Sequence, residues 1–212
     1  EAILGDMAVI ELVGSAPTGS GKTLAFSLPI LNELAEAPIE TKLTALILCP
    51  TRELALQVSE HIKVVGKYIP ALRLATIIGG MSEEKQTRLL SLNPTIIVAT
   101  AGRLAEMAEF DPQLQRNLQS IKFLVIDEAD RMVLDKQGKF PDLEKILKCT
   151  KTERTFLFSA TLSSEKLKKA FSTLRNRLNM RKPKQVHIEG TLNLREEKYQ
   201  AMEQNDKDKW LY

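Results

Sequence analysis

The sequence contains few of the residues that build disulfide frameworks or membrane spans. It has two cysteines, Cys49 and Cys149, in unrelated segments and without metal-ligand spacing, so we expect two buried, reduced thiols in an intracellular protein. No apolar run approaches the roughly 20 residues that a membrane-spanning helix needs. The first residues lack the basic stretch and apolar core of a signal peptide. These absences favour an intracellular globular protein with no membrane partner.

Aromatic residues and net charge are also low. Phe, Trp and Tyr make up 5% of the chain, which argues against the base-stacking surfaces of sequence-specific single-strand readers. The 30 basic and 27 acidic residues leave a formal net charge of +3, too small for a global field that attracts nucleic acid. The histidines, His61 and His187, lack a metal-spaced partner, so we expect structural roles for both. Any nucleic acid must therefore bind at local sites.

Short apolar runs alternate with longer helical patterns along the chain. Several runs are apolar at nearly every position, which is typical of strands covered on both faces in a parallel sheet. Alternating strand and helix units predict a doubly wound α/β fold, with a mostly parallel sheet sandwiched between helices. We expect strands at 9–13, 45–48, 75–78, 96–98, 123–126 and 155–158, and helices at 24–34, 52–68, 82–92 and within 163–183.

Three stretches do not fit this alternation. Residues 35–42 and 109–120 resemble loops or insertions, and residues 189–212 contain no further strand and helix unit. The length of 212 residues suits one large domain with ample core. We therefore expect one domain over residues 1–188 and a linker leading out of it over residues 189–212. Nothing in the sequence requires more than a monomer.

A glycine-rich loop between a predicted strand and a predicted helix is the most specific signal, since this is the context of a phosphate-binding loop. Glycines let backbone N–H groups turn towards phosphate oxygens, and the following helix adds the positive end of its dipole. Lys22 should reach the β- and γ-phosphates of a bound nucleotide, and the Thr23 hydroxyl should ligate Mg²⁺. The first position usually holds glycine, but here it is Ala16. A glycine-rich loop unrelated to nucleotides is the alternative, and the agreement of strand, loop and helix argues against it. The predicted nucleotide-binding residues are Ala16, Pro17, Thr18, Gly19, Ser20, Gly21, Lys22 and Thr23.

An acidic segment, Asp127-Glu128-Ala129-Asp130, directly follows the apolar run at 123–126. A carboxylate at the C-terminal end of a buried strand in an α/β sheet points into the ligand crevice. Asp127 is then placed to hold Mg²⁺, usually through water, and Glu128 to orient or deprotonate an attacking water. The alternative is that these residues only complement a helix N-terminus. The phosphate loop upstream favours a metal site.

Three more loops follow predicted strands and should emerge at the same edge of the sheet. Glycine N–H groups, hydroxyls and arginines suit a sugar-phosphate chain that is bound without base specificity. Each loop alone is a weak signal, and a helix cap with a salt bridge is the alternative for the first. The predicted backbone-binding residues are Pro50, Thr51, Arg52, Gly79, Gly80, Thr100, Gly102 and Arg103.

In this combination and order, the motifs resemble the first RecA-like domain of the DEAD-box RNA helicases over nearly the whole chain. The resemblance implies a RecA-like P-loop NTPase fold, ATP and Mg²⁺ as cofactors, and RNA held through its backbone by the loops just named. It implies catalytic roles for Lys22, Asp127 and Glu128. It also implies that Ser159 and Thr161, which end the last apolar run, couple the nucleotide state to RNA strand separation. A nucleotide- and RNA-binding clamp without productive unwinding, or a P-loop ATPase acting on DNA or protein, remain the alternatives.

The resemblance also shows departures from the family pattern. The family usually has proline at the position of Ala101, and its adenine-reading glutamine would precede Glu1. The second RecA-like domain, with its arginine finger, should start within residues 189–212, so we expect the chain alone to bind nucleotide weakly and hydrolyse it poorly. The segment after Asp130 and the tail with Lys209-Trp210 look similar to a eukaryotic nucleolar branch that works in large ribosomal subunit assembly, which implies a nuclear or nucleolar location.

Overall fold

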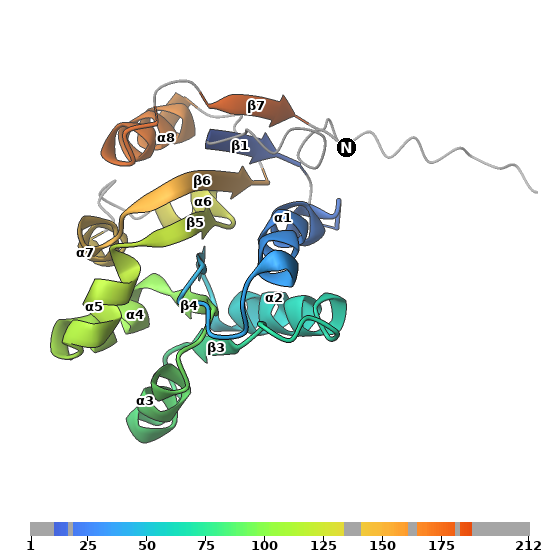
Figure 1. The fold of residues 1–212 in the computed structure, drawn as a ribbon. Helices are drawn as coiled ribbons and strands as arrows, with labels where there is room; N and C mark the ends of the chain where they lie inside the picture. Colours follow the sequence, from blue (N-terminus) through green and yellow to red (C-terminus); the bar gives the residue numbers. More distant parts are fainter. Residues whose placement is uncertain (1–10, 17–18, 134–140, 161–164, 181–182, 188–212) are drawn as a thin grey trace, which may run out of the picture.

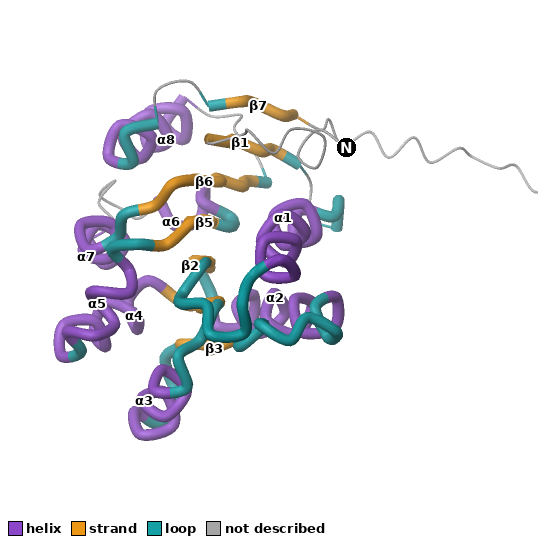
Figure 2. Tube along the Cα trace, in the orientation of Figure 1, coloured by secondary structure: helices purple, strands orange, loops and turns teal. Residues whose placement is uncertain are grey.

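Seven parallel strands form one sheet with helices on both faces (Figures 1 and 2). The computed structural model describes residues 11–16, 19–133, 141–160, 165–180 and 183–187. The strand order is β3-β4-β2-β5-β6-β1-β7, and every paired strand is parallel to its neighbour. The strands are β1 Glu11–Ser15, β2 Ala45–Cys49, β3 Leu74–Ile77, β4 Ile96–Thr100, β5 Ile121–Ile126, β6 Thr152–Ser159 and β7 Lys184–His187. The helices are α1 Lys22–Glu36, α2 Arg52–Val65, α3 Glu83–Ser91, α4 Ala101–Phe110, α5 Pro112–Leu118, α6 Ala129–Val133, α7 Pro141–Cys149 and α8 Glu165–Arg177.

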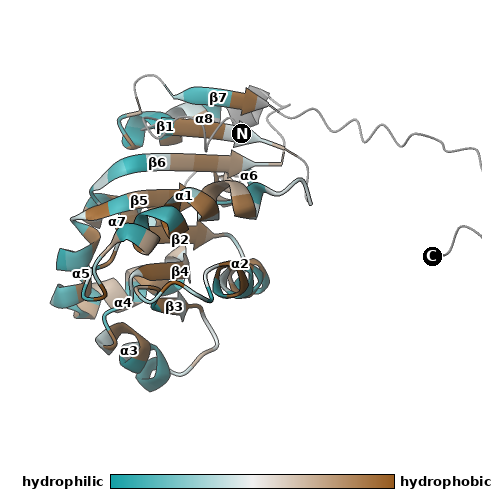
Figure 3. Ribbon diagram, turned by 45° about the vertical axis from the view of Figure 1, so that its right-hand side comes forward, coloured by the Kyte–Doolittle hydropathy of each residue, from teal (hydrophilic) through white to brown (hydrophobic). Residues whose placement is uncertain are grey.

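Both faces of the sheet are apolar, which confirms the α/β fold expected from the continuous apolar runs. In β2, Leu46 and Leu48 face the core beneath α4, α5, α7 and α8, while Ile47 and Cys49 face the core beneath α1 and α2. Figure 3 shows the central strands as an apolar layer between helices whose outer faces are hydrophilic. Burying one Leu or Ile side chain stabilises a fold by about 1.5–3 kcal/mol. Because the strands between these two cores are parallel, the loops that follow them emerge along one edge of the sheet.

The expectation of a loop or insertion over residues 109–120 is wrong, because this segment contains α5. Asp111 caps the helix: its Oδ1 accepts hydrogen bonds from the N–H groups of Gln113 (2.9 Å) and Leu114 (3.0 Å). Pro112 occupies the start of the helix, where its missing N–H costs nothing. Leu114 and Leu118, one turn apart, are both buried. The helix is too short for a periodic pattern, so its cap is the signal that sequence reasoning overlooked.

The other predicted loop is irregular from Ala37 onwards, although α1 continues to Glu36. The Arg73 guanidinium fastens this connection by donating to the carbonyl oxygens of Ile39 and Thr41, each at 2.6 Å, and of Asn93 at 2.8 Å. These bonds hold the connection at the edge of the sheet opposite the predicted site. The loop is therefore a structural element and carries no predicted site residue.

The two cysteines differ in their environments. Both are free thiols, but Cys49 is fully buried at the end of β2, whereas Cys149 at the end of α7 is only partly buried. The expectation of two buried thiols therefore holds for Cys49 alone. No helix in the described part of the chain is long and apolar enough to cross a membrane.

Candidate nucleotide site and nucleic-acid interface

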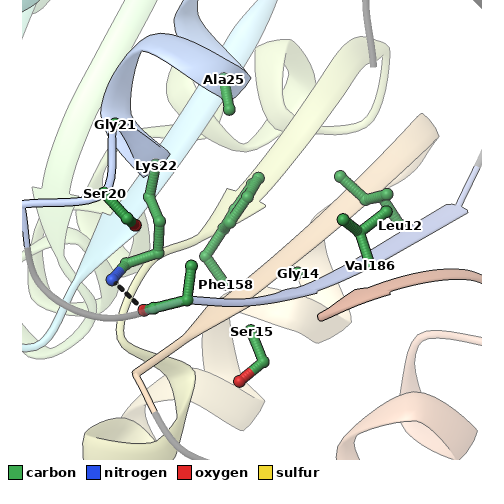
Figure 4. A pocket seen from close by; sticks show the side chains of 10 residues that line it. Leu12, Gly14, Ser15, Ser20, Gly21, Lys22, Ala25, Phe158 and Val186 are labelled. Atoms are coloured by element: carbon green, nitrogen blue, oxygen red, sulfur yellow. Dashed lines mark hydrogen bonds between the residues drawn. The ribbon is translucent and has the colours of Figure 1, made fainter. Parts of the chain in front are cut away.

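The glycine-rich loop connects β1 to α1. Gly19 and Gly21 have φ angles of 82° and 87°, a left-handed conformation that residues with a Cβ rarely adopt. The Lys22 Nζ atom donates a hydrogen bond to the Ala16 carbonyl oxygen at 2.5 Å, so its amine lies across the loop (Figure 4). The Ala16 N–H in turn donates to the carbonyl oxygen of Ser159 at 3.1 Å. The loop thus has the backbone shape of a phosphate cradle and is tied to the end of β6. Pro17 and Thr18 lie outside the described residues.

An apolar hollow opens beside this loop, between the start of α1 and the strands β1, β6 and β7. Its floor depends on Gly14, because a Cβ there would lie 2.8 Å from the Phe158 ring. Sequence reasoning missed both residues, since a glycine and a phenylalanine inside strands look like ordinary core. The hollow is lined by Leu12, Gly14, Ser15, Ala16, Ser20, Gly21, Lys22, Ala25, Phe158 and Val186 (Figure 4).

The acidic segment follows β5, as expected, and its two leading carboxylates are buried. Asp127 is 3% exposed and Glu128 is 8% exposed. The Asp127 Oδ1 atom accepts a hydrogen bond from the Glu128 N–H at 2.9 Å, and Glu128 has a φ of 45°. A non-glycine residue in this left-handed region stores strain of roughly 1–3 kcal/mol, and such residues cluster at functional sites. The turn therefore holds both carboxylates at the end of the strand at an energetic cost.

The electrostatics of Asp127 link the acidic segment to the glycine-rich loop. Burial raises the pKa of Asp127 from 3.8 to about 6; the N–H of Glu128 lowers it, the charge of Glu128 raises it, and the charge of Lys22 lowers it. Lys22 is thus close enough to act on Asp127, so the structure brings the two predicted motifs together. A buried carboxylate with a raised pKa is stabilised in its charged form by an added cation.

Two further residues of this turn were not assigned by the sequence. Arg131, one helical turn on, places Nη1 3.0 Å from Glu128 Oε2, although the contact lacks hydrogen-bond geometry. Asp130 is 8% exposed, and its Oδ1 has no hydrogen-bond partner within the described part of the chain. Buried polar atoms without partners are rare and costly. The turn therefore carries more negative charge than its own contacts satisfy.

These donors fit Mg²⁺. Magnesium prefers oxygen ligands and is usually held by one or two carboxylates together with substrate phosphates and water. Asp127 supplies such a carboxylate, and Thr23, at the start of α1, supplies a hydroxyl. The described residues contain no group of three or more His, Cys, Asp and Glu side chains that could hold a metal by themselves. Thr23 and Asp127 are therefore the oxygen donors of this site that could hold Mg²⁺ together with substrate phosphates.

The three predicted backbone-binding loops meet at one shallow depression beyond the ends of β2, β3 and β4. Arg52 lies over the glycine pair. A Cβ added to Gly79 would be 2.7 Å from Arg52 Nη2, and one added to Gly80 would be 2.7 Å from Arg52 Nη1. Gly80 also has a φ of 81°. A side chain at either position would therefore displace the Arg52 guanidinium, and the positive φ of Gly80 also favours glycine there. The depression is lined by Pro50, Thr51, Arg52, Glu53, Gly79, Thr100, Gly102, Arg103 and Glu106.

The helix-cap part of the alternative for Thr51 is confirmed, and it does not exclude a role in binding a nucleic-acid backbone. The Thr51 hydroxyl accepts a hydrogen bond from the Leu54 N–H at 3.2 Å and so caps α2. The guanidinium of its neighbour Arg52 lies next to Gly79 and Gly80. At the other end of the depression, Arg103 Nη1 lies 2.9 Å from Glu106 Oε2. The positive charge of Arg103 is therefore partly neutralised from within its own helix.

Gln86 supports the glycine loop and was missed by the sequence. It is fully buried, and it is the only buried side chain of α3. Its Nε2 atom donates to the Met81 carbonyl oxygen at 2.8 Å, directly after Gly80. The only available signal was a polar residue on the side of α3 that faces the core. The sequence alone does not show which side that is.

Ser159 and Thr161 complete the predicted residues. Ser159 ends β6, is fully buried, and binds the glycine-rich loop through its carbonyl oxygen. Thr161 lies outside the described residues. Ser159 thus connects the strand that neighbours β5 with the start of the phosphate loop.

The chain matches known proteins in both sequence and structure. Residues 2–170 match the family described as DEAD/DEAH box helicase. The chain is 47% identical over 156 residues to the ATP-dependent rRNA helicase RRP3 of Coccidioides immitis, covering 73% of this chain and 31% of that protein. It is 44% identical over 168 residues to the human protein named "Probable ATP-dependent RNA helicase DDX47", covering 78% and 35%. The chain thus spans about a third of the length of these relatives.

Solved structures agree with this relationship. The fold matches the crystal structure of a hypothetical ATP-dependent RNA helicase from Sulfolobus tokodaii with a TM-score of 0.70 and 31% identity, covering 89% of this chain and 51% of that one. A DEAD box protein from Methanococcus jannaschii also matches with a TM-score of 0.70 and 31% identity, over 84% and 45%. The fold is therefore the RecA-like α/β fold of these helicases, and the chain belongs to the DEAD/DEAH box helicase family.

Proposed function

We propose that this chain is the ATP-binding first RecA-like domain of an ATP-dependent RNA helicase. The observation that carries the proposal is the placement of two sites along one edge of a single sheet. The phosphate loop and the buried Asp127 lie at β1 and β5, and the arginine and glycine loops lie at β2, β3 and β4. One rigid sheet can thus transmit a change at the nucleotide to the nucleic acid.

At the nucleotide site, Gly19–Thr23 would hold the phosphates through backbone N–H groups and the dipole of α1. Lys22 would leave the Ala16 carbonyl and pair with the β- and γ-phosphates. Mg²⁺, held by Thr23 and Asp127, would neutralise the charge that develops on the transferred phosphate. Glu128 would accept a hydrogen bond from the attacking water and orient it, a role worth roughly 10²–10⁴ in rate for positioned acid or base groups.

At the nucleic-acid site, Arg52, Arg103 and the N–H groups around Gly80 would contact phosphates. Thr51 and Thr100 offer hydroxyls at the starts of α2 and α4. Phosphate and sugar contacts fix the position of a strand but carry no sequence information. The domain would therefore grip single-stranded RNA of any sequence, and Ser159 with Thr161 would relay the state of the nucleotide.

The pathway and the remaining parts of the enzyme belong to the same proposal. The RRP3 relatives, which are named rRNA helicases, support a role on rRNA. A nuclear or nucleolar location stays a prediction. Assembly of the large ribosomal subunit stays a prediction, because the relatives' names specify no subunit. A second RecA-like domain would supply the arginine finger, which is worth on the order of 10³–10⁵ in rate in related enzymes. The division into residues 1–188 and 189–212 also stays a prediction.

The test is ATP hydrolysis by the chain alone and by the chain joined to the second RecA-like domain of an RRP3 relative. The joined protein should hydrolyse ATP faster when single-stranded RNA is added, whereas DNA should have little effect. The chain alone should turn over slowly with or without RNA. Full RNA-stimulated turnover by the chain alone would contradict the proposal. ATP binding with no turnover in the joined protein would favour an RNA clamp.

A further inference from the structure

A second groove lies next to the nucleic-acid depression, between α3 and α4. We call it the α3–α4 groove. It plays no part in the proposed ATP or RNA contacts, except that Arg103 and Glu106 line both hollows. In Figure 1 the two helices lie at the same end of the sheet, near its β3 edge. The α3–α4 groove is lined by Glu83, Thr87, Arg103, Glu106, Met107, Phe110, Asp111 and Pro112.

The floor and rim of the α3–α4 groove are apolar on one side. Phe110, the last residue of α4, is 82% exposed. Met107, one turn earlier, is almost buried and contributes its side chain to the groove. A large aromatic ring left in water at the edge of a hollow contributes favourable free energy to any partner that covers it. Phe110 is thus an anchor point without a function inside the domain.

The charge of the α3–α4 groove is negative. Its lining includes three carboxylates, on Glu83, Glu106 and Asp111, and one cationic side chain, Arg103. Arg103 is already paired with Glu106. A phosphate backbone entering the groove would meet this negative charge and be repelled, whereas a cationic partner would be attracted. The groove therefore favours a different class of ligand from the adjacent depression.

We propose that the α3–α4 groove docks a protein segment that combines basic residues with a neighbouring apolar side chain. The apolar side chain would cover Phe110 and Met107. The basic residues would pair with Glu83 and Glu106. This pairing of an aromatic anchor with surrounding carboxylates matches the chemistry of such a segment in both shape and charge.

Docking of this segment would also change the affinity of the neighbouring depression for RNA. Glu106 now holds the guanidinium of Arg103, with Arg103 18% exposed and Glu106 66% exposed. The Arg103 Nε atom is buried and has no hydrogen-bond partner within the described part of the chain. A partner cation that takes Glu106 releases Arg103 to contact a phosphate. The docked segment therefore strengthens RNA binding, and this second step rests on the proposed RNA function.

The first experiment measures peptide binding by fluorescence anisotropy, without RNA. The probe is a labelled nine-residue peptide of alternating Arg and Leu, compared with the same peptide carrying Glu in place of Arg. Only the basic peptide should saturate. Phe110→Ala should weaken its binding by about 10-fold or more, and Glu106→Gln by up to about fivefold.

The chain contains matched controls for both substitutions. Tyr68 is an aromatic residue that is 84% exposed outside the groove, so Tyr68→Ala should leave peptide binding unchanged. Glu60 pairs with Lys63 three residues away, as Glu106 pairs with Arg103, so Glu60→Gln should also have no effect. Equal losses in Phe110→Ala and Tyr68→Ala, equal binding of the acidic peptide, or no saturable binding would overturn the proposal. Self-association that Phe110→Ala abolishes would overturn it in favour of a second copy of the chain.

The second experiment measures the Kd of single-stranded RNA with and without saturating basic peptide. The peptide should tighten RNA binding by up to about fivefold at low salt. Glu106→Gln should produce the same tightening without peptide, and Glu60→Gln should not. Competition between RNA and peptide would overturn the proposal, because the groove would then be part of the RNA surface. If the chain binds no RNA, the proposed function fails, while the peptide titration still decides the docking proposal.

Discussion

The two halves of the functional edge are built differently. At the β1 and β5 ends, the site consists of two continuous sequence segments. One is the glycine-rich loop, whose Gly19 and Gly21 are exposed, and the other is the acidic turn, whose Asp127 and Glu128 are buried. At the β2, β3 and β4 ends, the site consists of side chains from three separate loops, with Arg52 exposed and Arg103 partly buried. The first half favours a compact multivalent cation with its phosphates. The second half favours an extended polyanion. The proposed nucleotide site and the proposed nucleic-acid site therefore lie at different parts of one sheet edge. A substitution in one site should leave ligand binding at the other unchanged.

The largest expected effect is on the turnover of ATP, and it concerns the buried acidic turn. Glu128→Gln should lower the rate of ATP hydrolysis by about 100-fold or more, because the amide cannot act on the attacking water. ATP and RNA binding should change little, since the shape of the side chain is kept. The measurement is RNA-stimulated hydrolysis by the chain joined to a second domain, with equilibrium binding of both ligands. A parallel loss of RNA affinity would show that the two halves are not separable.

A second effect tests the cost of the buried charge. Asp127→Asn should raise the free energy of unfolding of the ligand-free chain by up to about 3 kcal/mol at pH 8. Because the pKa of Asp127 is raised to about 6, the folded chain keeps its proton at pH values where the unfolded chain has lost it. Stability of the original chain therefore falls as the pH rises from about 4 to about 6, and stays lower above that.

Denaturant unfolding at pH 4, 6 and 8 measures this prediction. The difference between Asp127→Asn and the original chain should be much smaller at pH 4, where the folded carboxyl group is protonated and the unfolded one, with a pKa of 3.8, is only partly ionised. The asparagine retains an oxygen for the Glu128 N–H, so the turn is preserved. A difference of constant size across this range would mean that the pKa of Asp127 is not raised.

A third effect concerns the depression at the ends of β2, β3 and β4. Gly79→Ala would place a Cβ 2.7 Å from Arg52 Nη2 and push the guanidinium out of its place. RNA affinity should fall by about 10-fold, which is typical for the loss of one charged phosphate contact, while ATP affinity stays the same. Filter binding of RNA and of nucleotide measures the two separately. Arg52→Ala is the reference, and the double substitution should be no worse than either single one, because both remove the same contact.

The smallest effect concerns Gln86 as a positioning residue. Gln86→Leu leaves the Met81 carbonyl without its donor and should cost about 1–2 kcal/mol of stability. The glycine loop should then bind RNA a few-fold more weakly, seen as a higher KM for RNA at unchanged kcat. Gln86→Glu, which keeps the shape but has no donor when ionised, should show the same KM change. An equal fall in kcat would indicate a general structural role for Gln86.

The local sequence was sufficient to predict an element where the residues of one continuous segment indicate its structure by themselves. The strands at 45–48, 96–98 and 123–126 were predicted to within two residues, because continuous apolar runs imply a strand covered on both faces. The glycine-rich loop was also predicted at the right place, between a strand and a helix, and Gly19 and Gly21 have positive φ there; its binding of phosphate stays a prediction. The prediction for 109–120 was wrong because α5 is only seven residues long and depends on the Asp111 cap.

What the sequence by itself determined was the doubly wound α/β fold and the positions of the glycine-rich loop and the acidic turn, because each of these is encoded by neighbouring residues. Only the tertiary structure decided how the separate parts act on one another. It placed Arg52 against Gly79 and Gly80, put the charge of Lys22 within reach of Asp127, and set Glu106 between the RNA depression and the α3–α4 groove. These relations join residues far apart in the chain, so they depend on strand order and helix packing, which no local pattern specifies.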